Sequence, residues 1–237
     1  MTAAKSVRIL PLHFILRRLH SLAGLLPLSV FLLEHIFTNS YSLIGAEAYN
    51  SKIEALQGLP FVVVIEVLFI FVPIAFHALY GLVIIYEGRT NVHQYGFEAN
   101  WRYTTQRITG ILGIVFVAYH VYATRITSYL TGTPMSYAWM QELLADPIKV
   151  IFYLVGSTSL IFHFANGLWT GLIVWGVTAS PASQRLSLKL AWLVFFGLAI
   201  VNVLIILNFA YPDGTARPAI VGTILSFVKT WLFGTLK

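Results

Sequence analysis

Long apolar segments alternate with short polar ones along most of the chain. Five runs, at about residues 19–43, 60–87, 104–129, 148–177 and 187–210, are dominated by aliphatic and aromatic side chains, and the segments between them are rich in Gly, Pro, Asn and charge. A helix needs about 20 apolar residues to cross the ~30 Å hydrocarbon core of a bilayer. The pattern therefore predicts five transmembrane helices of alternating direction.

The composition excludes a soluble bundle of the same five helices. Hydrophobic residues make up 58% of the 237 residues and charged residues only 10%, which leaves too little polar surface to solvate five such helices. We therefore expect one all-α integral membrane domain at residues 19–210, after a cytoplasmic segment at residues 1–18. The last part, residues 211–237, contains an apolar stretch broken by Lys229, which we expect to lie at the membrane interface or against a partner; a sixth crossing stays open.

The first apolar run also has to be weighed as a signal peptide. It follows basic residues and could be cleaved near "IGAEA". However, the run is long for a signal sequence and carries Glu34 and His35 near its far end, which a removed segment would not need. We expect it to be retained as the first helix.

The distribution of basic residues predicts a cytoplasmic N-terminus. With the N-terminus inside, the outer loops before the tail hold Lys52, Arg125 and Lys149, whereas the inner segments hold nine Lys and Arg: Lys5, Arg8, Arg17, Arg18, Arg89, Arg102, Arg107, Arg185 and Lys189. The net charge of +6 does not indicate nucleic-acid binding, because these residues flank apolar runs and form no basic aromatic patch.

The chain has no Cys, which excludes thiolate-bound iron–sulfur clusters and C-x-x-C-H haem attachment. Any redox centre must then be held by His or Met. His35, His77, His120 and His163 fall one in each of the first four predicted helices, 42, 43 and 43 residues apart. A single intramembrane His is commonly a core or proton-relay residue, but four at matched spacing favour metal ligation.

The depths of these four residues indicate two pairs. At ~1.5 Å per residue from the inner face, His35 and His120 lie ~24 Å deep, and His77 and His163 lie ~15–21 Å deep. Two imidazoles from facing helices are the usual axial ligands of a b-type haem, whereas zinc would require about four converging ligands. We expect two haems b, the inner one on His77 and His163 and the outer one on His35 and His120.

Glycines on the same helix faces could give a flat macrocycle room. Gly24, Gly81, Gly113 and Gly167 lie within roughly 40° of His35, His77, His120 and His163 around their respective helices. The alternative for each glycine is close helix packing.

Charged residues near the pairs are candidates for further roles. Arg17, Arg18 and Arg107, at the inner ends of helices, could bind the propionates of the inner haem, and Arg125 those of the outer haem; simple topology signalling is the alternative for the inner three. Glu66, in the outer half, is either a proton carrier or the partner of an Arg such as Arg125. We take Glu66 as the outer candidate for a quinone or proton site, and His20 with Ser21 as the inner candidate.

A series of motifs in the chain resembles the dihaem cytochrome b membrane subunit of succinate:quinone oxidoreductases, of the single-chain, five-helix, Bacillus-like type. The motifs run in order over about residues 15–190: "RRLHSLAGLLPLSVFLLEH", "GAEAYNS", "FHALYG", "NW", "QRITGI", "YHVYATR", "FHFANGLW" and "WGVTASPASQR". The resemblance implies that His77 and His163 hold the proximal haem and that His35 and His120 hold the distal one.

The resemblance also implies partners and a location that composition cannot show. These are a flavoprotein subunit with the succinate site, an iron–sulfur subunit, menaquinone as the electron acceptor, and a bacterial cytoplasmic membrane. The chain would then anchor the catalytic subunits of a respiratory succinate dehydrogenase and relay their electrons to quinone.

Two other functions stay open on the sequence. The chain could be the cytochrome b of another quinone-linked enzyme, such as a nitrate reductase or hydrogenase, although their His spacing differs. It could instead be a transporter that relays protons through His and Glu, although no paired broken helices support this.

Overall fold

The computed structural model describes residues 11–212, 222–223, 226–227 and 230. Lys5, Arg8 and most of the C-terminal tail lie outside the described residues. The predicted interfacial or partner-bound position of the tail therefore also concerns residues outside the described part. Five helices in the described part are long and apolar enough to cross a membrane, namely Leu12–Leu43, Val62–Glu87, Glu98–Thr131, Pro147–Val174 and Pro181–Ala210. This confirms the prediction of an all-α membrane protein with five spans.

The first three spans are built from several helical segments, whereas the last two are single α-helices. The segments are α1 (Leu12–Ala23), η1 (Gly24–Leu28), α2 (Ser29–Ser40) and η2 (Tyr41–Leu43); α4 (Val62–Glu66), η3 (Val67–Phe71) and α5 (Val72–Glu87); α6 (Glu98–Val121), η4 (Tyr122–Ile126) and α7 (Thr127–Thr131); α9 (Pro147–Val174); and α10 (Pro181–Ala210). Two short helices, α3 (Ala46–Gln57) and α8 (Tyr137–Leu143), lie in the connections between spans.

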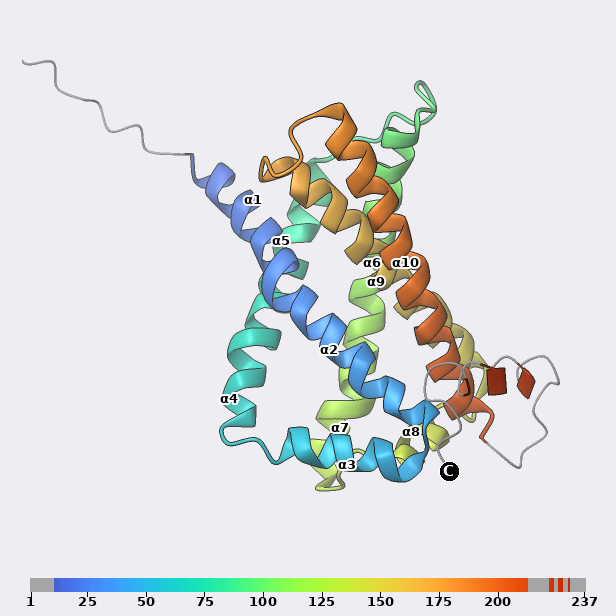
Figure 1. Ribbon diagram of the computed structural model, residues 1–237. Helices are drawn as coiled ribbons and strands as arrows, with labels where there is room; N and C mark the ends of the chain where they lie inside the picture. Colours follow the sequence, from blue (N-terminus) through green and yellow to red (C-terminus); the bar gives the residue numbers. More distant parts are fainter. Residues whose placement is uncertain (1–10, 213–221, 224–225, 228–229, 231–237) are drawn as a thin grey trace, which may run out of the picture.

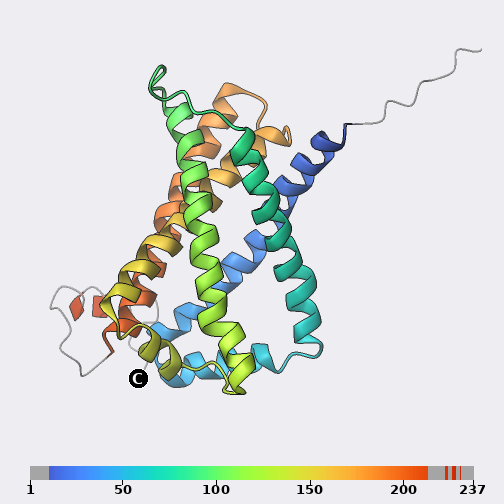
Figure 2. The same ribbon diagram turned by 180° about the vertical axis from the view of Figure 1, so that it is seen from behind.

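The five spans run in alternating directions (Figures 1 and 2). The start of α1, the α5–α6 loop and the α9–α10 loop lie at one end of the bundle, which we call the inner end; α3, α7 and α8 lie at the other, the outer end. Helix α9 packs along both α6 and α10, and α1 packs along α5. The first span therefore lies beside the second, and the third beside the fourth.

Local sequence explains where the last two spans begin. Asp146 caps α9 by accepting a hydrogen bond from the Ile148 backbone, and Ser180 forms a capping box with Ser183 at the start of α10. Each cap is followed by Pro at the first helical position, where its missing N–H costs nothing. Gly176, at φ 74°, adopts the left-handed conformation that ends α9.

Three π-helical turns, η1, η3 and η4, interrupt the spans. Pro27 lies inside η1, and Pro73 follows η3 by two residues. A proline removes one intrahelical hydrogen bond, and a widened turn relieves the clash of its ring with the preceding turn. The third π turn, η4, begins two residues after His120 and contains Arg125.

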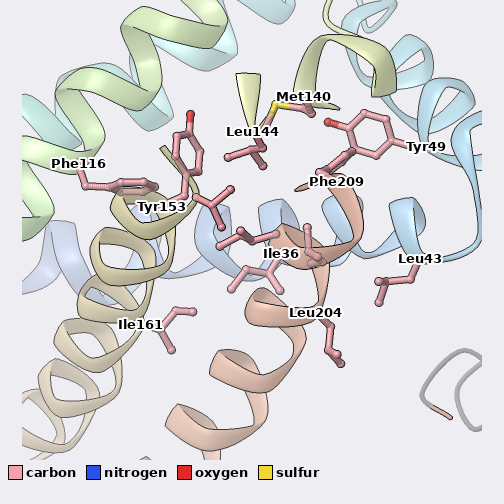
Figure 3. Packing of buried hydrophobic residues seen from close by; sticks show 13 residues of the cluster. Ile36, Leu43, Tyr49, Phe116, Met140, Leu144, Tyr153, Ile161, Leu204 and Phe209 are labelled. Carbon is pink, nitrogen blue, oxygen red and sulfur yellow. The ribbon is translucent and has the colours of Figure 1, made fainter. Parts of the chain in front are cut away.

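The buried apolar core lies mostly toward the outer end of the bundle (Figure 3). There Leu43, Tyr49 and Phe209 are almost fully buried, and the buried Asn208 amide donates hydrogen bonds to the Ser42 carbonyl and the Tyr137 hydroxyl. Burial raises the pKa of Tyr49 to about 12, so its phenol stays neutral. Elsewhere large apolar side chains point outward, as expected for helices in contact with lipid.

Candidate metal-binding histidine pairs

The four intramembrane histidines lie on four different helices and meet as two pairs. His77 on α5 and His163 on α9 have ring centroids 6.1 Å apart with an interplanar angle of 87°. His35 on α2 and His120 on α6 have ring centroids 5.7 Å apart with an angle of 82°. The structure thus brings together the same residues that the depth count paired.

These separations suit two imidazoles on opposite sides of one metal ion. Metal–nitrogen bonds to imidazole are about 2.0–2.1 Å long, which places the ring centroids of opposed ligands roughly 6 Å apart. Among the described residues, no group of three or more His, Asp or Glu side chains is placed to hold a metal ion. A haem iron takes only its axial ligands from the protein, so a pair is sufficient.

Hydrogen bonds show which ring nitrogen of His77 and His163 is available to bind a metal ion. Nδ1 of His77 lies 3.0 Å from the His20 carbonyl oxygen, and Nδ1 of His163 lies 3.0 Å from the Gln106 carbonyl oxygen. A carbonyl can only accept, so Nδ1 carries the hydrogen in both rings. Nε2 of each ring is then the unprotonated nitrogen, as metal coordination requires.

In the outer pair the hydrogen-bond partner is a side chain. Nδ1 of His120 lies 3.2 Å from the Tyr153 hydroxyl oxygen, and the ring of Phe116 stacks on the His120 ring. His35 packs against Phe31, with ring centroids 5.3 Å apart. Glu34, next to His35, accepts a hydrogen bond of 2.6 Å from Thr38 on its own helix.

His20 lies directly against the inner pair. Its ring stacks on the His77 ring, with centroids 4.0 Å apart and an interplanar angle of 11°. Its neighbour Ser21 accepts a hydrogen bond of 3.1 Å from the Trp175 indole. The structure therefore places His20 beside His77, and Ser21 at the contact between the first and fourth spans.

The four glycines make room for protein side chains of neighbouring helices. A Cβ at Gly24 would lie 2.7 Å from His77 Cε1, and one at Gly81 would lie 3.3 Å from His20 Nε2. Gly113 similarly faces Leu160, and Gly167 faces the Gln106 amide. The neighbours of these glycines thus support close helix packing. Gly24 lies against His77 of the inner pair, although it belongs to the same span as His35 of the outer pair.

Three of the four candidate arginines lie at the inner end, in different environments. Arg17 forms an exposed ion pair of 2.5 Å with Glu87. Arg18 donates to the Val174 carbonyl and lies over the Trp175 ring. Arg107 lies over the Tyr103 ring, and its buried Nε has no hydrogen-bond partner among the described residues. Arg107 therefore keeps a donor available for an anionic group.

Glu66 and Arg125 meet at the outer half of the bundle. Glu66 Oε2 lies 2.6 Å from Nη2 and 3.0 Å from Nε of Arg125. Their side chains are 23% and 31% exposed. Of the two roles open for Glu66, the structure shows the ion pair with Arg125.

Sequence reasoning missed a polar cluster on α6 and α9. The Arg102 guanidinium, on a residue only 6% exposed, lies between the rings of Trp169 and Trp192. Gln106 donates to the His163 carbonyl and accepts a hydrogen bond of 2.7 Å from the Asn166 amide. The "FHFAN" sequence could have indicated Asn166, which follows His163 by three residues and shares its helix face.

The fold and the site together define a class: an all-helical, multi-pass membrane protein with paired imidazoles between its helices. The family model described as "Succinate dehydrogenase/Fumarate reductase transmembrane subunit" matches residues 89–206. The succinate dehydrogenase cytochrome b558 subunit of Bacillus subtilis (strain 168) is 40% identical to this chain over 197 residues, which cover 83% of this chain and 97% of that protein. The chain belongs to the family of transmembrane subunits of succinate dehydrogenase and fumarate reductase, which confirms the resemblance seen in the motifs.

Proposed function

We propose that the chain is the cytochrome b subunit of a succinate:quinone oxidoreductase, which anchors the catalytic subunits and conducts their electrons to quinone. The family assignment and the relative named as a cytochrome b558 subunit support this function. The observation that carries it is the presence of two imidazole pairs between facing helices, with ring centroids 6.1 and 5.7 Å apart.

The chain would hold two haems b through these pairs. His77 and His163 would ligate the inner iron, and His35 and His120 the outer iron. The Nδ1 hydrogen bonds of His77 and His163 fix the ring orientations and leave Nε2 free for the metal, and the Tyr153 hydroxyl is the partner of Nδ1 of His120. When bound, the two haems supply one-electron redox carriers at two depths of the membrane.

Arginines at the inner end would bind the propionates of the inner haem. Arg107 is the strongest candidate because its buried Nε lacks a partner among the described residues. Arg17 and Arg18 lie at the same end and could exchange their present contacts with Glu87 and Val174 for a carboxylate. Arg125 would serve the outer haem only while also paired with Glu66.

The quinone, menaquinone by analogy with the family resemblance, would take up electrons and protons within the membrane. His20 with Ser21 is the inner candidate for its site, because His20 stacks on His77. Glu66, which is paired with Arg125, is the outer candidate.

The complex would reside in a bacterial cytoplasmic membrane with the N-terminus of this chain inside. A flavoprotein subunit and an iron–sulfur subunit would dock at the inner end, nearest to the pair His77 and His163. Electron passage between the depths of the two pairs would move charge across the bilayer and couple turnover to the membrane potential. Succinate oxidation in sealed vesicles that does not respond to the membrane potential would contradict this coupling.

A reduced-minus-oxidised spectrum of the purified protein, combined with its haem-to-protein ratio, tests the proposal. Two b-type haems per chain are expected. A protein purified without haem would favour the proton-coupled transporter, whose intramembrane His and Glu residues would then relay protons. Two haems with no succinate-dependent reduction in the assembled complex would favour another quinone-linked respiratory enzyme.

A further inference from the structure

We propose that Tyr153 is a positioning residue for the outer haem, whose hydroxyl accepts the Nδ1 hydrogen of His120 and thereby sets the orientation and electron donation of this ligand. The inference rests on the proposed function, because it assumes that iron binds Nε2 of His120. With Nε2 on the metal, Nδ1 carries the hydrogen and the phenol oxygen, 3.2 Å away, is its acceptor.

The His120 ring packs against two aromatic rings that also pack against each other. Phe116, one helical turn earlier on α6, stacks on it with centroids 5.5 Å apart and an interplanar angle of 16°. Tyr153, from α9, meets it edge-on at 5.6 Å and 72°. Phe116 and Tyr153 also contact each other, at 5.2 Å and 87°, and lie side by side in Figure 3. The imidazole therefore has little freedom to rotate about χ2.

Tyr153 is itself held firmly. Its side chain is buried, with the residue 4% exposed, and packs against Phe116, Tyr119 and Phe152. One turn later, Ser157 donates to the Tyr153 carbonyl and accepts a hydrogen bond of 2.8 Å from the Asn202 amide on α10. These contacts tie the backbone that carries Tyr153 to two helices and give the phenol a defined position.

The two haem sites differ in how the Nδ1 hydrogen is accepted. For His77 and His163 the acceptors are backbone carbonyls, those of His20 and Gln106, which no substitution removes directly. For His120 the acceptor is a side chain. Replacing Tyr153 by Phe therefore deletes one ligand hydrogen bond at the outer site and leaves the two inner ones unchanged.

The hydrogen bond has a predictable effect on the metal. A partner at Nδ1 increases the basicity of Nε2, and a more basic ligand stabilises the oxidised iron relative to the reduced iron. Loss of the acceptor should therefore shift the midpoint potential of the outer haem to a more positive value. The ring also loses one restraint on its orientation, which should alter the low-spin EPR signal of that haem.

The test is a potentiometric titration, followed optically and by EPR, of the purified complex with Tyr153→Phe. We expect two haems per chain, a positive shift of the outer potential and an unchanged inner potential.

Tyr119→Phe is the matched control. Tyr119 belongs to the same aromatic cluster, with its ring 6.5 Å from that of Tyr153, but it makes no hydrogen bond to a histidine in the described part of the chain. It should leave both potentials unchanged. Equal shifts in the two variants, or no shift in Tyr153→Phe, would overturn the proposal.

A second variant covers the case in which Tyr153→Phe does not assemble. Fluorotyrosine at position 153 keeps the hydroxyl but makes its oxygen a weaker acceptor, so the outer potential should shift in the same direction by a smaller amount; an unchanged potential would overturn the inference. These failures are distinct from a failure of the proposed function, which would show as a wild-type complex without haem or without succinate-dependent haem reduction. They are also distinct from a wrong assignment of His120 as a ligand, because His120→Ala would then retain both haems, whatever happens at Tyr153.

Discussion

The ion pair of Glu66 and Arg125 is an unusual feature for a transmembrane region, because isolated charges are costly there. Two nitrogens of the Arg125 guanidinium approach one carboxylate oxygen of Glu66, at 2.6 and 3.0 Å. The pair links the second span to the third near the outer end. Removing one partner would leave the other charge without compensation in a largely apolar setting.

We predict that Glu66→Gln destabilises the protein by roughly 1.5–3 kcal/mol, the range for loss of a hydrogen bond to a charged group. Thermal unfolding in detergent would measure the effect. Glu87→Gln is the matched control, because it breaks the ion pair between Glu87 and Arg17, whose side chains are 36% and 48% exposed, respectively. Loss of this exposed ion pair should cost roughly 0–1 kcal/mol. Equal losses in the two variants would contradict the prediction.

Single residues could be predicted from the sequence where their chemistry is rare in a membrane. The spacing of the four histidines was sufficient to pair them, since helix geometry converts residue number into depth. Tyr153 and Gln106 could not be found in this way. Tyr is common in apolar segments, and the Gln106 carbonyl that meets His163 belongs to the backbone, so neither leaves a distinctive sequence signal.

The start of the π turn η1 supports the inner pair in two ways. The carbonyl of His20, one turn before, accepts both the Gly24 backbone hydrogen and the Nδ1 hydrogen of His77. Gly24 itself lets the first span approach the His77 ring. A side chain at this position would collide with the imidazole, and the stiff α5 backbone gives the ring little room to retreat.

Gly24→Ala should therefore cost roughly 1–3 kcal/mol through overpacking and should lower the occupancy of the inner haem more than that of the outer one. The haem-to-protein ratio and thermal unfolding would show this. Gly197→Ala on α10 is the control, because a Cβ there meets no atom of the described residues within 4 Å and should be neutral or stabilising by up to ~1 kcal/mol. A Gly24→Ala protein that matches wild type would refute this role of the glycine.

The predicted spans agree with the observed helices in number and order, but their ends differ. The helices α6 and α10 begin six residues earlier than predicted, at Glu98 and Pro181, because their first turns are polar and are invisible to a search for apolar runs. The short helices α3 and α8 were missed for a related reason. Their stability depends on packing at the outer end, where Tyr49 and Met140 are buried, rather than on a long apolar pattern.

The molecule as a whole is expected to lie with its inner end in the cytoplasm. The α5–α6 loop, residues 88–97, is at the inner end with the start of α1, and the connection from α7 to α8, residues 132–136, is at the outer end. The natural absence of Cys allows the orientation to be tested with single introduced thiols.

A membrane-impermeant maleimide applied to intact cells should label Thr133→Cys and should not label Asn91→Cys. After the cells are permeabilised, both proteins should react. Labelling of Asn91→Cys alone in intact cells would reverse the orientation and place the pair of His77 and His163 on the far side from the catalytic subunits.

The two histidine pairs are expected to ligate two haems. The most direct test is the haem-to-protein ratio and reduced-minus-oxidised spectrum of four variants, His35→Ala, His77→Ala, His120→Ala and His163→Ala. Each variant should fall from two haems per chain to about one. His77→Ala and His163→Ala should retain the same spectral component, and His35→Ala and His120→Ala the other. Retention of two haems by any variant, or retention of different components by two variants of one pair, would contradict ligation of the two haems by these pairs.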